Sequence, residues 1–501
     1  MKMAANQSGK PLPRRCGPQH RLIPALLTGL IAFAGTGCAH RVWNDRIDHP
    51  AAGERYEFRN RLPKNSQDLF VVLAFSGGGT RAAAFSYGVL QSLRDTAVTV
   101  DGTQRRLLDE VDVVTAVSGG SYTAAYYGLF GDRIFTDYTR DFLYRDWQGE
   151  LIGLAARPRS LAAMSSGDFN RSDLVADYLG RTLFRHATYA DLSRNGLPFV
   201  IINASDLNNA TTFSFMQQQF DFLCSDLSSY PVGHAVMASS AVPGPFASIA
   251  LRNYDDCSER HRPWVAEALT HDDFLDRRRA VALALDRYAH TDRMPILRLV
   301  DGGVTDNLGV RGSMMSPVAH YGNVPDMAGA FTHEQLGRVR NVLVIVANAQ
   351  VYAETAWSLH GREPGTVGML QASFDSALGL LNTETVALAK QGFLMWGAHV
   401  NAMRPPGEPG VTVDFAVLTF DQISDRPTRD QFNAMPTTFR LGPGEVDALI
   451  AEPARLLEQS PQYQSFLRRI SPPSPAGLRP DVENMTRKTS TSHDSSASKA
   501  K

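Results

Sequence analysis

Two apolar runs that each stop at a glycine turn constrain the fold of this chain more than any other feature. Leu69–Phe75 is followed by Ser76-Gly-Gly-Gly-Thr-Arg81, and Val111–Val117 is followed by Ser118-Gly-Gly120. Continuous apolar runs rich in strand formers are typical of strands covered on both faces. Apolar residues continue with helix-like spacing beyond each turn, so both segments are predicted to be strand, turn and helix units.

Further apolar runs predict a larger sheet. They are Phe199–Ala204, Ile296–Val300, Asn341–Ala347 and Val411–Phe420, with helical patterns between most of them. This alternation predicts an α/β fold with a mostly parallel central sheet wrapped by helices. Ligands bind beyond the carboxyl ends of the strands in such sheets, so we expect both glycine turns, and the residue after Val300, at that edge.

The pattern fits one α/β unit over residues 67–425, with insertions near 132–196 and 250–294 that cap the site. A helical segment over 426–470 follows. Residues 39–66 are charged and aperiodic and are interpreted as a tether. The Ser-, Thr- and Lys-rich end, 471–501, lacks apolar residues for a core and is predicted to be disordered.

The first 38 residues have the order of a secretory signal. A positively charged leader precedes the apolar segment Leu22–Ala34, which is shorter than the roughly 20 residues of a spanning helix. Small residues then precede Cys38, an arrangement that resembles bacterial lipoprotein precursors. We therefore expect a lipid anchor at Cys38 and a location in the cell envelope, as an outer-membrane lipoprotein facing the periplasm or the surface. Simple cleavage and a retained apolar anchor are the alternatives.

The composition limits which partners and cofactors the chain is expected to bind. The 501 residues have a formal net charge of -1 and are 43% hydrophobic, which allows a large core and gives no indication of nucleic-acid binding. Arg277–Arg287 fits an amphipathic helix whose basic face is solvated or touches anionic lipid. Cys224 and Cys257 form either a disulfide or two buried thiols. No zinc-type motif occurs, so neither a metal nor another cofactor is predicted, although scattered carboxylates leave calcium open.

Ser118 is the candidate nucleophile, because a strand that turns sharply into a helix exposes the side chain at the corner. The usual form of such an elbow is G-x-S-x-G. Gly120 fills its later position, and Ala116 replaces the earlier glycine. An ordinary strand-to-helix turn is the alternative.

A serine nucleophile also needs a base and donors for the oxyanion. The amides of Gly77, Gly78 and Gly79 are candidate donors, with phosphate binding as the rival interpretation. Asp301, directly after Ile296–Val300, is the candidate base, although Asp-Gly-Gly is also typical of a simple turn. Arg81 either reinforces the glycine loop or covers the helix.

Together, Gly77-Gly-Gly-Thr-Arg81, Ser118 with Gly120, and Asp301-Gly-Gly303 resemble the patatin-like phospholipase family, the serine lipid acyl hydrolases with a Ser-Asp dyad. Supporting stretches resemble it too, and the resemblance spans roughly residues 68–310. These stretches are Ile202–Leu207, Ala238–Gly244 and Gly303–Leu308.

The resemblance implies that Ser118 is the nucleophile, that Asp301 is a base needing no histidine, and that Gly77–Gly79 form the oxyanion hole. It implies supporting positions at Arg81, Gly120, Gly302 and Gly303. The implied activity is hydrolysis of acyl esters of membrane lipids, most plausibly phospholipids.

Three alternatives stay open. The first is acyl transfer to an alcohol other than water. The second is a catalytically silent envelope lipoprotein that binds lipid or a partner. This alternative is suggested by Ala116, which replaces the first glycine of the elbow motif. The third is a triad using a histidine after Ser118, for which the candidates are His320, His333, His360 and His399.

Overall fold

The computed structural model describes residues 41–47, 55–58, 65–195, 198–270, 277–312, 337–352, 361, 363 and 365–471. The predicted leader with Cys38, part of the predicted tether and residues 472–501 of the predicted tail lie outside these residues. So do His320, His333 and His360.

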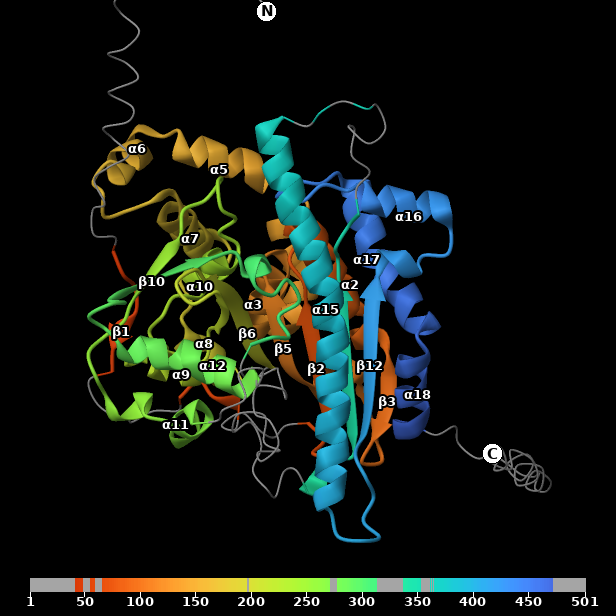
Figure 1. Cartoon of the computed structure of the whole chain (residues 1–501). Helices are drawn as coiled ribbons and strands as arrows, with labels where there is room; N and C mark the ends of the chain where they lie inside the picture. The colour runs from red at the N-terminus through yellow and green to blue at the C-terminus, as the bar shows by residue number, and fades with distance from the viewer. Residues whose placement is uncertain are drawn as a thin grey trace, which may run out of the picture.

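An eight-stranded sheet forms the centre of the described chain, with helices on both faces (Figure 1). Its spatial order is β12-β11-β2-β5-β6-β10-β9, with β7 also paired to β6. The first five strands of that order are mutually parallel. They are β12 (Thr412–Thr419), β11 (Asn341–Asn348), β2 (Leu69–Phe75), β5 (Val111–Val117) and β6 (Phe199–Asp206). The predicted α/β class with a largely parallel sheet is confirmed.

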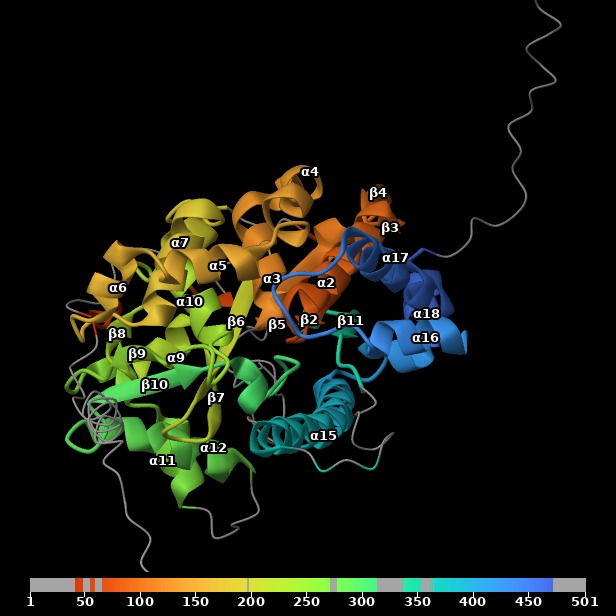
Figure 2. The same cartoon turned by 90° about the horizontal axis from the view of Figure 1, so that it is seen from above.

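Strands β2 and β5 have the bounds that the sequence predicts, and all residues of both are buried. Helix α2 (Gly79–Asp95) follows β2, and helix α3 (Gly119–Phe130) follows β5. Both predicted strand, turn and helix units are therefore present. Figure 2 shows α2, α3 and α17 on one side of the sheet and α15 on the other.

Strand β10 (Ile296–Val300) differs from the expected parallel arrangement, because it runs antiparallel to β6. Only its last residues overlap with β6: Leu299 pairs with Asp206, and Val300 pairs with Ser205. Asp301 therefore reaches the carboxyl edge of the parallel strands from the opposite direction. The sheet is completed beyond β6 by two further antiparallel strands, β7 (Thr211–Ser214) and β9 (Ile249–Arg252).

The C-terminal region belongs to the same body. Helix α15 (Thr366–Met403) joins β11 to β12, and the predicted helical segment consists of α16 (Arg426–Asn433), α17 (Pro443–Gln459) and α18 (Pro461–Ile470). Helix α17 packs along α2, and α18 packs against β12.

The remaining elements are short. The two predicted insertions contain helices α4–α8, together with α11 and α12, and α12 has nearly the bounds expected for the basic amphipathic helix. The helices of the first insertion are α4 (Ile134–Tyr138), α5 (Trp147–Ala155), α6 (Pro158–Met164), α7 (Arg171–Thr182) and α8 (Tyr189–Arg194), and those of the second are α11 (Pro263–Leu269) and α12 (Arg277–Asp286). Between the two insertions lie α9 (Gln217–Asp221) and α10 (Val232–Ser239). Two small ribbons pair β3 (Ala97–Val100) with β4 (Thr103–Arg106), and β1 (Asp45–Arg46) with β8 (Ser225–Asp226).

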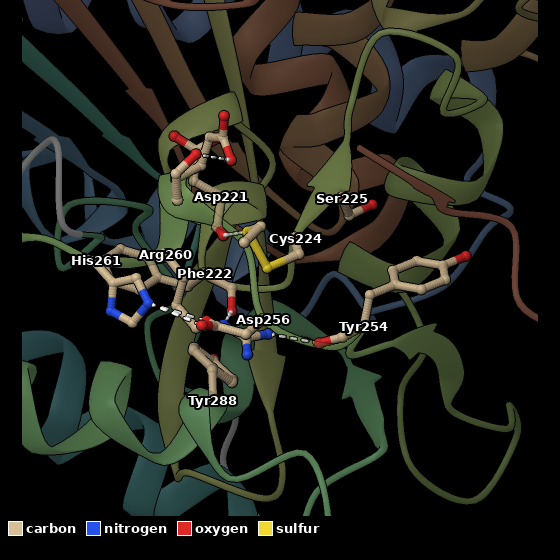
Figure 3. Close-up of a disulfide and its surroundings, with 12 residues drawn as sticks. Asp221, Phe222, Cys224, Ser225, Tyr254, Asp256, Arg260, His261 and Tyr288 are labelled. Carbon is tan, nitrogen blue, oxygen red and sulfur yellow. Dashed lines mark hydrogen bonds and ion pairs between the residues drawn. A yellow bond between two sulfur atoms is a disulfide. The ribbon is translucent and has the colours of Figure 1, made fainter. Parts of the chain in front are cut away.

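Cys224 and Cys257 form a disulfide, which decides between the two states left open by the sequence (Figure 3). The bond ties the turn after α9 to the loop that follows β9. Arg260 reinforces this link, because its guanidinium donates to the Phe222 carbonyl and to the Tyr254 carbonyl. Buried Asp221, at the end of α9, accepts hydrogen bonds from Arg55 and Arg262.

Replacing both cysteines by alanine is expected to lower the free energy of unfolding by about 2 to 4 kcal/mol, because the 33-residue separation makes a sizeable closed loop in the unfolded chain. Denaturant unfolding with and without dithiothreitol measures the effect. The reductant should shift the midpoint of the parent protein toward that of the double variant and leave the variant unchanged. An identical midpoint for the parent in both conditions would contradict the prediction.

Candidate active site

Ser118 occupies a sharp corner between β5 and α3. Its backbone has φ 47° and ψ -121°, a conformation that L-residues rarely adopt and that marks functional corners. The Ser118 amide donates to the Ser239 hydroxyl at 2.8 Å, and that hydroxyl donates to the Asn203 carbonyl at 2.6 Å. A side chain from α10 therefore holds the corner in place.

Ala116 does not prevent this corner. It is fully buried within β5, where it pairs with Ile202 of β6. The chain leaves the extended conformation only at Ser118, two residues later. A glycine at position 116 is therefore not needed for the tight turn.

The structure brings Ser118 and Asp301 into direct contact, although 183 residues separate them in the sequence. The Ser118 hydroxyl donates to Oδ2 of Asp301 at 2.8 Å. The other carboxylate oxygen, Oδ1, accepts the amide of Gly303 at 2.8 Å. The Asp301 amide itself donates to the Ala241 carbonyl at 3.0 Å, which ties the acid to the segment after α10.

Burial raises the pKa of Asp301 from 3.8 to about 6. The hydrogen bonds from Gly303 and Ser118 act in the opposite direction, but burial is the larger influence. Both of these donors are neutral, so the carboxylate gains no stabilising cation from them. A carboxylate with this pKa is ionised at neutral pH and is a stronger proton acceptor than an exposed aspartate.

The glycines after Ser118 allow two segments of the backbone to approach closely. A Cβ on Gly119 would lie 2.1 Å from the Gly79 carbonyl oxygen, and one on Gly120 would lie 2.7 Å from the Ser76 carbonyl oxygen. The Gly120 amide donates to that same Ser76 carbonyl at 3.2 Å. The start of α3 thus packs directly onto the glycine loop after β2.

The structure differs from the sequence prediction in one of the three candidate oxyanion donors: the amide of Gly119 takes the place of the amide of Gly77. The Gly77 amide already donates to the Asn307 carbonyl at 3.0 Å. Within the described residues, the amides of Gly78, Gly79 and Gly119 have no hydrogen-bond acceptor in the protein. They lie at the starts of α2 and α3, where unpaired amides and the helix dipole favour negative charge. Gly119 was missed because the elbow pattern draws attention to the residues two positions from the serine.

Gly302 and Gly303 shape the loop that holds the acid. A Cβ on Gly302 would lie 2.4 Å from the Asn203 carbonyl oxygen, and one on Gly303 would lie 3.0 Å from Oδ1 of Asp301. Asn307, for which the sequence predicted no role beyond its place in the stretch Gly303–Leu308, lies between this loop and the glycine loop. A Cβ on Gly77 would be 2.4 Å from its side-chain oxygen, and one on Gly303 would be 3.1 Å from it.

Arg81 is buried and points away from the dyad. Its guanidinium donates to the carbonyls of Ala349 and Met435 at 2.9 and 2.7 Å, and to the Thr437 hydroxyl at 3.0 Å. Burial lowers its pKa to about 10, so the guanidinium stays charged at neutral pH. Of the two roles expected for Arg81, the structure favours reinforcement: the side chain fixes α2 to the C-terminal part of the chain.

The dyad is almost completely buried. Ser118 and Asp301 are only 6% and 7% exposed. Phe246, from the loop after α10, and Phe439, from the segment between α16 and α17, meet with ring centroids 6.3 Å apart. Phe439 also contacts Tyr122 of α3, at 5.8 Å. The rings of Phe246, Phe439 and Tyr122 thus form an apolar cluster beside the start of α3.

In the part of the chain that the structure describes, no histidine forms a hydrogen bond with Ser118 or Asp301. Buried His234 packs against Trp43, with ring centroids 4.2 Å apart, and His399 is exposed on α15. Across the described residues, no cluster of three or more His, Cys, Asp or Glu side chains could hold a metal ion.

Residues 73–313 match the family model for patatin-like phospholipases. They form a patatin-like phospholipase domain. This match begins within β2, extends past β10, and includes the glycine loop, Ser118 and Asp301. The match supports a lipid hydrolase activity for this domain.

Solved structures are similar to the chain only at low sequence identity and low TM-score. Human GIVD cytosolic phospholipase A2 in complex with methyl gamma-linolenyl fluorophosphonate has 13% sequence identity and a TM-score of 0.37, over 81% of this chain and 60% of that one. VipD from Legionella pneumophila has 12% identity and a TM-score of 0.29, over 81% and 67%. In a second structure of the human enzyme, this chain spans only 47% of the length. No curated protein sequence matches the chain.

Proposed function

We propose that this protein is a serine hydrolase that cleaves acyl esters of lipids, with phospholipids as the substrate, through an acyl-enzyme on Ser118 with Asp301 as the base. The observation that carries the proposal is the 2.8 Å hydrogen bond from the Ser118 hydroxyl to the Asp301 carboxylate. This distance is within the reach required for direct proton transfer. The patatin-like phospholipase domain supports the same chemistry.

In this mechanism, Asp301 accepts the hydroxyl proton while the Ser118 oxygen attacks the ester carbonyl carbon. The amides of Gly78, Gly79 and Gly119 stabilise the oxyanion that forms. Collapse of this intermediate breaks the bond to the leaving alcohol, which takes the proton from Asp301. A water molecule then gives a proton to Asp301 and attacks the acyl carbon. Ser118 leaves as the alcohol by taking that proton back.

We also propose that the protein acts in the cell envelope, anchored through Cys38. The leader and the residues before Cys38 support export. The disulfide between Cys224 and Cys257 adds support from the folded domain, because such bonds persist in oxidising compartments such as the bacterial periplasm. The proposed lipid substrate and the proposed location agree, because membrane lipid is present there.

Labelling with an alkyl fluorophosphonate tests the proposed chemistry. We expect one covalent adduct, which peptide mass spectrometry locates on Ser118. The rate of labelling should fall about tenfold for each pH unit below about 6, because protonated Asp301 cannot accept the serine proton. The raised pKa places this acid limb near pH 6 instead of near 4. An adduct on another residue, or no labelling at any pH, would reject the proposal.

A further inference from the structure

Helix α15 exposes an unusual amount of apolar side chain. Within the described residues, seven of the thirteen large apolar side chains that are exposed belong to this one helix. In its N-terminal part, Leu370 and Leu380 are each 68% exposed, Met369 is 53% exposed and Phe374 is 37% exposed. Single exposed apolar residues are ordinary, but a row of them on one element marks an interaction surface.

The N-terminal part of α15 projects beyond the sheet. The helix runs antiparallel to β12: Phe393 packs on Phe415 with ring centroids 6.0 Å apart, and farther along the helix Asn382 donates to Gln350, just past the end of β11. Residues before Asn382 therefore lie beyond the carboxyl ends of the strands. At 1.5 Å per residue, Thr366 lies about 24 Å past that edge. Figure 1 shows this end of α15 rising above the strand ends.

The projecting part lies at the same edge of the sheet as the candidate active site. Asp375 interacts electrostatically with Arg81, which belongs to the helix that follows the glycine loop. Gly379 of α15 lies against the side chains of Gln350 and Tyr352, and Tyr352 is itself 53% exposed. The apolar row and the Ser118 corner are thus at the same edge of the sheet.

Other exposed apolar residues occur at the same end of the molecule. Ile152 of α5 is 65% exposed, and Leu161 of α6 is 54% exposed. Figure 1 shows α5 and α6 at the end where α15 begins, and Figure 2, seen from above, shows them across the sheet from α15. The exposed apolar elements therefore stand on two sides of the edge that contains the dyad.

We propose that the projecting part of α15, residues 366–380, docks this edge onto the surface of a lipid bilayer. The inference rests on the proposed function, because a lipid hydrolase must take its substrate from a membrane. The position of the surface beside the site favours a bilayer over a protein partner. Among the described residues, none of the helices could span a bilayer. In the proposed contact, the exposed apolar side chains of the projecting part enter the lipid interface.

A tryptophan reporter tests this contact directly. The full-length chain with Phe374→Trp is mixed with phosphatidylcholine vesicles that contain brominated acyl chains. We expect bromine to quench the added fluorescence. Lys390→Trp is the matched control: it is also exposed on α15 but lies at the level of the strands, and it should be quenched far less. This readout does not depend on an anchor at Cys38, since both variants share that anchor.

Activity measurements test the consequence. The double variant Leu370→Glu with Phe374→Glu is expected to hydrolyse phospholipid in vesicles about tenfold more slowly, because two charges replace the apolar contact. Its hydrolysis of a water-soluble short-chain ester should be unchanged, since neither residue touches the dyad. Exposed positions of this kind rarely affect folding.

Two outcomes would overturn the docking proposal. One is equal quenching at positions 374 and 390. The other is a concentration-dependent dimer in sedimentation that Leu370→Glu abolishes, without quenching at position 374, which would assign the face to a second copy. If the parent cleaves neither substrate, the proposed function fails, and the quenching experiment still decides the docking.

Discussion

Replacing Ser118 by alanine is expected to lower kcat/KM for a short-chain ester by at least about 10⁴-fold, because the substitution removes the attacking oxygen and with it the acyl-enzyme. The methyl group fits the same space, and only the hydrogen bond to Asp301 is lost, so folding should be preserved. Ester hydrolysis together with thermal unfolding measures both effects. Ester cleavage at the parent rate by this variant would refute the role of Ser118.

Asp301→Asn serves as the paired variant, because it tests the base. It is expected to lower activity but to raise the stability of the folded protein. Activity should fall by a similar factor, since an amide accepts no proton. Burial raises the pKa of Asp301 from 3.8 to about 6, so the ionised carboxylate destabilises the folded state, by an upper value of about 3 kcal/mol at neutral pH. The parent therefore loses stability as pH rises from about 4 through 6, and the variant does not.

Comparing the parent and Asp301→Asn at two pH values separates the destabilisation by the ionised carboxylate from a change in stability that does not depend on pH. At pH 7.5 the melting temperature of Asp301→Asn should exceed that of the parent, and near pH 4 the difference should shrink. An inactive variant that is less stable than the parent at both pH values would indicate that Asp301 serves mainly to hold the loop together.

The sequence predicted the centre of the sheet well because its signals are local. Strands β2 and β5 are uninterrupted apolar runs that end at glycines, and their bounds match the structure. Asp301 was expected at the correct edge, but on a parallel strand. The antiparallel course of β10 depends on its pairing with β6 and β9, which apolar periodicity does not encode.

The rest of the site depends on contacts between distant residues. The Gly77 amide is occupied by the carbonyl of Asn307, and Arg81 bonds to carbonyls 268 and 354 residues away. The sequence analysis named no helix over the range of α15, because α15 has apolar residues on its exposed side as well as on its buried side, and this obscures the helical period. Its projection past the strands follows from packing against β12, which only the structure reveals.

Gly119→Ala is expected to lower kcat/KM by about 10² to 10³-fold, the effect of losing one oxyanion donor. The added Cβ would lie 2.1 Å from the carbonyl oxygen of Gly79 and 2.7 Å from its amide nitrogen. Both atoms belong to the main chain, so no side-chain rotation relieves the contact. The peptide of Gly79 must shift instead, and this peptide contributes a proposed donor. The same crowding should reduce the free energy of unfolding by about 1 to 3 kcal/mol.

Gly153→Ala is the matched control, because Gly153 lies in α5 and a Cβ added there would have no atom within 4 Å. That variant should keep full activity and gain about 0.5 to 1 kcal/mol of stability from the higher helix propensity of alanine. The measurement that decides is whether the fall in kcat/KM of Gly119→Ala comes from kcat or from KM. Misplaced donors act on the transition state, so kcat should fall while KM for a small soluble ester stays nearly constant. A rise in KM alone would assign Gly119 to substrate binding and remove its amide from the proposed oxyanion hole.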